Sequence, residues 1–86
     1  MRMGELASSY TAYEWRDAFL SLESLMGRSL VESLIEALDQ YGIDLSKNHV
    51  SIKVEDMRMA LTLIFGDAGE MLIDRLARYL TLRRRE

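Results

Sequence analysis

Residues 61–68 read LTLIFGDA, and the same pattern occurs earlier in the chain as LESLMGRS at residues 22–29. In both stretches, apolar side chains at helical spacing precede a glycine, and a small residue, Ser29 or Ala68, follows two positions later. Glycine accepts the left-handed backbone that ends many helices, so each stretch predicts a helix, a glycine and a second helix. We expect each small residue to lie where neighbouring helices approach closely. The predicted fold is all-α, with two helix–glycine–helix hairpins joined by an extended connector over residues 43–53.

Apolar residues recur three and four positions apart along most of the chain, which is typical of amphipathic helices. This spacing predicts four short helices, over residues 11–26, 29–41, 54–65 and 67–82. The expected organisation is a flexible N-terminal segment (1–10), a single helical domain (11–82) and a basic frayed tail (83–86).

Two local patterns mark the ends of the second predicted helix. Ser29 and Glu32 have the spacing of a capping box, in which each side chain binds a free backbone N–H of the first turn. Gly42 and Ile43 follow the last turn, an order that predicts a glycine C-cap with an apolar residue folding back onto the helix.

The connector contains a short alternating pattern. Val50, Ile52 and Val54 alternate with polar residues, which is typical of a strand. No second alternating run offers a partner, so two alternatives remain open. The segment is either an extended connector whose apolar side chains fill the core, which we prefer, or a strand that pairs with its own copy across a dimer axis.

Charge is distributed unevenly along the 86 residues, whose net charge is −3. Residues 75–86 contain five arginines and one glutamate, whereas the preceding residues are acidic. Arginines at the end of a helix complement its dipole, and they also suit contact with a polyanion. The apolar runs are far shorter than the roughly 20 residues that span a bilayer, and no secretory signal pattern opens the chain. We expect a cytoplasmic protein.

Few residues offer chemistry. The chain has no cysteine and one histidine, His49, which we expect to be exposed in a polar loop. Glu55 and Asp56 are explained by the dipole at the start of a helix. No nucleophile motif, phosphate-binding glycine loop or metal-ligand spacing is present. We expect no catalytic residues, no cofactor, no metal and no enzyme activity.

The preferred hypothesis is a protein-interaction module that forms a homodimer or binds another chain. A chain this small has more apolar side chains than we expect one core to hide, and aromatic residues are frequent interface anchors. The candidate interface residues are Tyr10, Tyr13, Trp15, Met59 and Leu63.

The alternative hypothesis is a nucleic-acid-associated helical domain. Its candidate polyanion contacts are Arg78, Arg83, Arg84 and Arg85. Glu32 and Glu36 argue against this alternative, because carboxylates near the start of a recognition helix repel phosphate.

Three segments resemble a family of small, mostly archaeal helical domains called Nitrosopumilus output domains. The matching segments are residues 22–27 (LESLMG), 41–45 (YGIDL) and 60–69 (ALTLIFGDAG). The resemblance implies an output or accessory module in signalling, and it carries over no catalytic residue. The aromatic residues before Leu20 lie outside the matching segments.

Overall fold

The computed structural model describes residues 8–85 of the chain, with side chains for residues 8–82. The chain is mostly helical, as expected, but it also contains a small two-stranded antiparallel sheet. The elements in chain order are β1 (Ser9–Thr11), α1 (Ala12–Leu20), α2 (Glu23–Met26), α3 (Arg28–Gln40), β2 (Ser51–Lys53), α4 (Val54–Phe65) and α5 (Asp67–Arg85).

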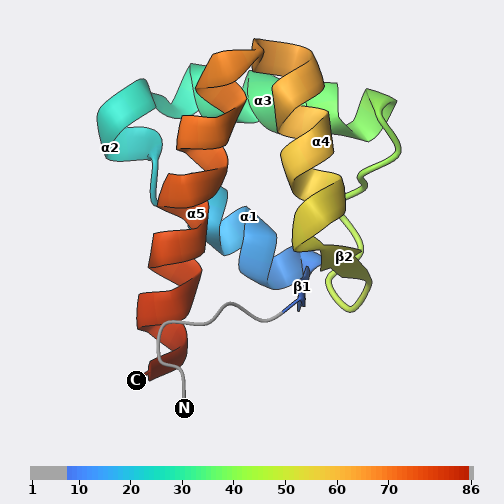
Figure 1. Cartoon of the computed structure of the whole chain (residues 1–86), viewed down its shortest axis with the longest axis vertical. Coiled ribbons are helices and arrows are strands. Elements are labelled where there is room, and N and C mark those ends of the chain that lie inside the picture. Colours follow the sequence, from blue (N-terminus) through green and yellow to red (C-terminus); the bar gives the residue numbers. More distant parts are fainter. Residues whose placement is uncertain (1–7, 86) are drawn as a thin grey trace.

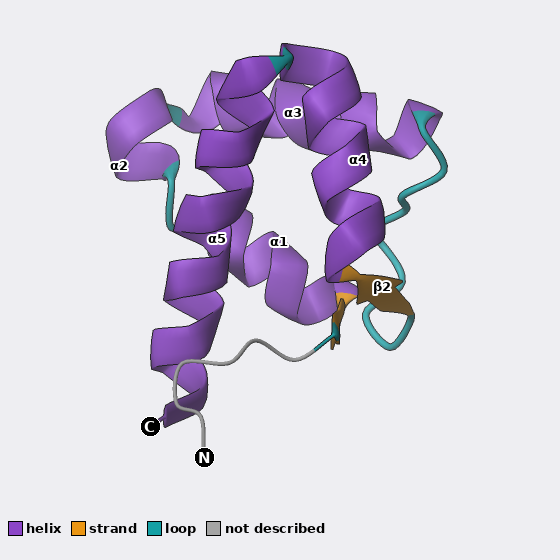
Figure 2. Ribbon diagram, in the orientation of Figure 1, coloured by secondary structure: helices purple, strands orange, loops and turns teal. Residues whose placement is uncertain are grey.

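Helices α4 and α5 pack side by side, and α3 crosses at the end where they meet (Figure 1). Helix α1 packs against α5 from the opposite side of the core, and the short α2 lies next to the start of α3 (Figure 1). The two strands sit at the other end of α4, just before its first turn (Figure 2). Within the described residues, no helix is both long and apolar enough to cross a membrane.

The last three residues of the predicted connector form a strand, Ser51–Lys53, with a partner in the same chain. Tyr10 pairs with Ile52 in an antiparallel register, flanked by the pairs Ser9–Lys53 and Thr11–Ser51. The preference for an unpaired connector was therefore wrong, and so was a flexible segment that extends to Ser9 and Tyr10. The partner strand has only three residues, too few for an alternating pattern to appear in the sequence.

The first helix is shorter than predicted. Thr11 begins it through a capping box, in which the Glu14 N–H donates to Thr11 Oγ1 at 3.2 Å and the Thr11 N–H donates to Glu14 Oε1 at 2.9 Å. The predicted helix over residues 11–26 is interrupted at Ser21, whose hydroxyl donates to the Ala18 carbonyl, and it resumes as α2. The break lets the chain turn before Gly27.

The predicted cap at the start of α3 differs from the structure, whereas the predicted cap at its end agrees with it. No side chain caps the first turn, because the helix already begins at Arg28 with Gly27 as the cap, so the predicted Ser29 capping box was wrong. The glycine C-cap was correct: the Ile43 N–H donates to the Leu38 carbonyl at 3.0 Å, Gly42 has a φ of 86°, and Ile43 is buried.

The core is built around Trp15, which is fully buried. Its indole N–H donates to the Ile52 carbonyl at 3.0 Å, and the Tyr10 ring packs edge-on against it with centroids 5.6 Å apart. Across the core, the Tyr79 hydroxyl donates to Asp17 Oδ2 at 3.1 Å and links α5 to α1. The remaining core residues are aliphatic or aromatic side chains from every helix except α2.

Helices α4 and α5 approach each other closely at Gly69. A Cβ atom at this position would lie 2.5 Å from the backbone oxygen of Leu61 and 2.8 Å from the backbone nitrogen of Thr62. The expected contact at Ser29 and Ala68 was wrong, since both residues are exposed. The small residue that permits close packing of α4 and α5 is the next one along the chain.

The α5 helix continues through Arg85, so the predicted frayed tail is helical in its backbone at residues 83–85. The side chains of Arg83, Arg84 and Arg85 lie outside the described residues, as does the expected flexible segment at residues 1–7.

We predict that Gly69→Ala destabilises the fold by about 2 kcal/mol, because the methyl group meets a helix backbone that cannot rotate away. Urea unfolding followed by circular dichroism measures the change. In an uncrowded helix the same substitution stabilises by roughly 1 kcal/mol, so an increase in stability would contradict the close approach. Ala68→Gly at the neighbouring exposed site is the matched control and should cost roughly 1 kcal/mol or less.

Candidate functional site

Two of the predicted interface residues are part of the core. Tyr10 is 2 % exposed and Trp15 is 0 % exposed, so neither can contact a partner in the folded chain. The prediction for these two residues was wrong because their aromatic rings pack against each other within the core of the same chain. A sequence shows that an aromatic side chain needs burial, but it does not show whether the same chain provides it.

Tyr13 is exposed, but it belongs to a local cluster on α1. The Arg16 guanidinium lies 5.9 Å from the centre of the Tyr13 ring. Arg16 also donates to the Leu45 carbonyl and, at 2.6 Å, to Asn48 Oδ1. This arginine, which the sequence did not single out, holds the loop between α3 and β2 against α1.

Met59 and Leu63 form an exposed apolar strip on α4. They are 59 % and 67 % exposed, whereas Met57, Ala60 and Leu61 of the same helix are buried. Asp56 precedes them on the same side of the helix, and we call Asp56, Met59 and Leu63 the α4 ridge. The ridge borders a depression of about 260 Å³. The depression is lined by Tyr41, Gly42, Ile43, Asp56, Met59, Ala60 and Leu63.

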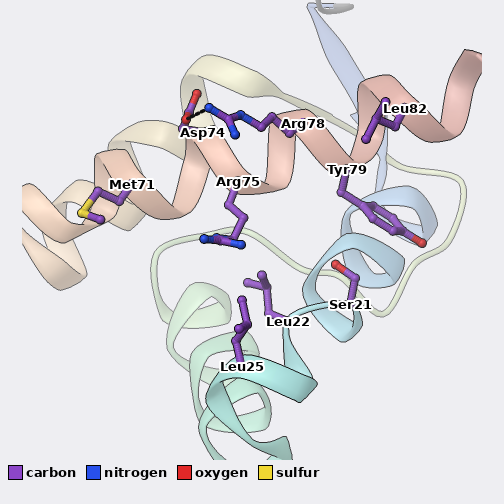
Figure 3. Close-up of a pocket in the computed structure, with 9 residues that line it drawn as sticks. All are labelled: Ser21, Leu22, Leu25, Met71, Asp74, Arg75, Arg78, Tyr79 and Leu82. Atoms are coloured by element: carbon purple, nitrogen blue, oxygen red, sulfur yellow. Dashed lines mark ion pairs between the residues drawn. The ribbon is translucent and has the colours of Figure 1, made fainter.

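A larger groove of about 460 Å³ lies between α2 and α5 (Figure 3). Its apolar walls include Leu25 and Met71, which are 64 % and 74 % exposed. We call this the α2–α5 groove. It is lined by Ser21, Leu22, Leu25, Met71, Asp74, Arg75, Arg78, Tyr79 and Leu82.

The charges of the α2–α5 groove come from α5. Arg75 projects across the groove toward Leu22 and Leu25 (Figure 3) and makes no ion pair among the described residues. Arg78 lies 3.5 Å from the Asp74 carboxylate, and both side chains are largely exposed. An approaching phosphate would therefore meet a carboxylate beside Arg78, the one predicted polyanion contact whose side chain is described.

This groove was not predicted from the sequence. Met71, Arg75, Arg78 and Leu82 recur three and four positions apart, and that spacing places them on one side of α5. The spacing is a usable signal, but the opposite wall comes from α2, which was predicted to continue the first helix. Only the break at Ser21 brings Leu25 to face α5.

The described residues contain no group of three or more His, Asp or Glu side chains that could hold a metal ion. His49 is exposed in the loop, as predicted. Asp44 has a lowered pKa, because the Ser46 hydroxyl and the Ser46 N–H donate to its carboxylate at 2.6 and 2.9 Å, with Lys47 nearby. This arrangement is a local turn motif that orders the chain after α3.

We compared the sequence and the fold with known protein families, with curated proteins and with solved structures, and none of them matches.

We predict that an NMR titration of the folded chain gives the Asp44 carboxylate a pKa below its ordinary value of 3.8. The pKa of Asp44 is lower in the folded chain than in the unfolded chain. The charged carboxylate therefore stabilises the fold fully above the unfolded pKa, and this stabilisation is lost as the pH falls through the folded pKa. Ser46→Ala should raise the pKa toward 3.8 by removing the largest contribution, and Lys47→Ala should raise it less. An unchanged titration in Ser46→Ala would contradict this account.

Proposed function

We propose that this protein is a non-enzymatic interaction module that associates with a second copy of itself. The observation that supports the proposal is the α4 ridge. Met59 and Leu63 stay more than half exposed on a helix whose opposite side fills the core. Water contact with such side chains is unfavourable by roughly 25 cal/mol per Å² of apolar surface.

The ridge is a continuous feature. Its two apolar side chains lie one helical turn apart, and Tyr41, which is half exposed, adds an aromatic ring to the same surface. Scattered single apolar residues are normal on a protein surface, whereas neighbouring ones beside a depression are typical of interaction sites. Tyr13 does not line this depression, so the proposed interface keeps Met59 and Leu63 and leaves out the N-terminal aromatic residues.

Pairing of two copies into a homodimer is the first step of such association, because dimers are the commonest oligomers of soluble proteins. The role of an output or accessory domain in archaeal signalling, in the cytoplasm, also remains a proposal. The signalling role rests on the resemblance of residues 22–27, 41–45 and 60–69 to the output-domain family, and the location rests on the short apolar runs of the sequence.

The organisation into two helix–glycine–helix hairpins is a further part of the proposal. It is supported by Gly27 and Gly66, which both have positive φ and stand at the junctions of α2 with α3 and of α4 with α5. The two units differ in their first helix, which is one continuous helix in α4 and is divided between α1 and α2 in the other unit.

Light scattering behind a sizing column tests self-association. We expect the wild-type chain to reach at least twice its mass of 9.9 kDa as concentration rises. The double variant Met59→Lys/Leu63→Lys should remain at the mass of one chain, because two buried lysines without partners disfavour the contact. Both positions are exposed, so circular dichroism should show an unchanged fold.

The matched control is Leu30→Lys, which changes an exposed leucine on α3. Leu30 lines neither the depression beside the α4 ridge nor the α2–α5 groove, so this variant should associate like the wild type. A wild-type chain that stays monomeric at every concentration contradicts the proposal. So does a double variant that associates as strongly as the wild type.

A further inference from the structure

We propose that self-association is head-to-tail, with the α4 ridge of one copy docked in the α2–α5 groove of the next. This inference rests on the proposed function and specifies the second half of the contact. The ridge and the groove belong to different parts of the fold: α2 and α5 lie on one side of the molecule, and α4 with the segment after α3 lies on the other (Figure 1).

Charge complementarity selects this pairing. The α2–α5 groove carries the guanidinium groups of Arg75 and Arg78 against the single carboxylate of Asp74. The α4 ridge carries the carboxylate of Asp56, with the exposed Glu55 beside it in the same first turn. Arg58, the one cationic residue of α4, lies roughly 100° around the helix from Met59 and points away from the ridge. Opposite charges therefore meet when ridge and groove combine.

A symmetric contact through either surface alone is less favourable. Pairing two ridges brings the Asp56 carboxylates of both copies into one interface, and pairing two grooves brings together the arginines of both copies. Like charges across an interface disfavour that partner arrangement. A ridge in a groove avoids both repulsions, and it gives Arg75 the carboxylate partner that it lacks among the described residues of its own chain.

The residue spacing of the ridge and the apolar lining of the groove also suit this contact. Asp56, Met59 and Leu63 occupy positions i, i+3 and i+7 of one helix, which is the spacing by which a helix anchors in an apolar groove. The groove offers apolar walls on both sides: Leu25 of α2 with Leu22 in the turn before it, and Met71 of α5 (Figure 3). Met59 and Met71 have flexible, polarisable side chains that adapt to an irregular contact.

The arrangement has a consequence for assembly size. A pair of copies joined by one ridge–groove contact leaves one ridge and one groove uncovered. Heterologous contacts of this kind continue into rings or open chains. The mass of the wild-type chain should therefore increase beyond that of a dimer at high concentration.

A mixing experiment tests the inference. The ridge variant is Met59→Lys/Leu63→Lys, and the groove variant is Leu25→Glu/Arg75→Glu; all four side chains are exposed in one copy. Each variant alone should run as a monomer, whereas an equimolar mixture should form a complex of about twice 9.9 kDa and no larger. The mixture retains one intact ridge and one intact groove, so it can make a single contact. Leu25→Ala/Arg75→Ala is the milder groove variant if circular dichroism shows that the glutamates disturb the fold.

The outcomes of these experiments distinguish failure of the ridge–groove contact from failure of self-association. If the wild-type chain associates and the groove variant associates equally well, or if the mixture stays monomeric, the ridge–groove contact is wrong while self-association stands. If the wild-type chain is monomeric, self-association itself fails. If the monomeric wild type instead binds a fluorescein-labelled acidic helical peptide or a DNA duplex, and Arg75→Glu abolishes that binding, the groove serves a different occupant and the inference is overturned.

A charge exchange gives a second reading. Asp56→Lys should weaken association by about 10-fold at low salt, and combining Asp56→Lys with Arg75→Glu should restore most of it, as judged from dissociation constants by light scattering. If the double variant associates no better than Asp56→Lys alone, Asp56 and Arg75 do not meet.

Discussion

Trp15 lies fully buried in the hydrophobic core, and its indole N–H donates to the backbone carbonyl of Ile52. An indole N–H without a partner in an apolar core is unfavourable, so this one hydrogen bond fixes where β2 passes over α1. The position of β2 in turn fixes β1, because Tyr10 pairs with Ile52 and also packs edge-on against the Trp15 ring. Thr11, the last residue of β1, then caps α1 and returns the chain to Trp15. β1, α1 and β2 thus form a closed set of contacts around one side chain.

The helical pair α4–α5 completes the core from the other side. Its close approach depends on Gly69, and Tyr79 connects the pair to Asp17 on α1. The inward faces of both helices are used in this packing, and their outward faces remain in water. The α4 ridge and the α5 wall of the α2–α5 groove therefore lie on the outward sides of the same packed pair, where Met59, Leu63 and Met71 stay exposed.

The head-to-tail contact that we propose follows from the opposite character of these two surfaces. Apolar exposure alone favours association but does not select a partner, whereas charge selects one arrangement over another. The ridge is apolar and acidic, and the groove is apolar and basic, so each surface complements the other better than it complements itself. In the proposed assembly, a small chain without disulfides would also gain stability, because any contact made only by the folded chain shifts the folding equilibrium toward that state.

The sequence by itself determined the helical class, the approximate extents of α3 and α4, and the turn at Gly42, because these depend on residues that are neighbours along the chain. Helical spacing and a glycine followed by an apolar residue act within one or two turns. It also identified Met59 and Leu63 as residues off the inward stripe of α4. Only the tertiary structure decided the β1–β2 pairing, the burial of Tyr10 and Trp15, the Arg16 contacts with the loop, and the meeting of Leu25 with Arg75. Each of these joins segments far apart in sequence, and the local pattern of either segment is unchanged whether or not the other is present. A three-residue strand or a break at Ser21 has too few residues to produce a periodic signal, so its place is set by the core that forms around it.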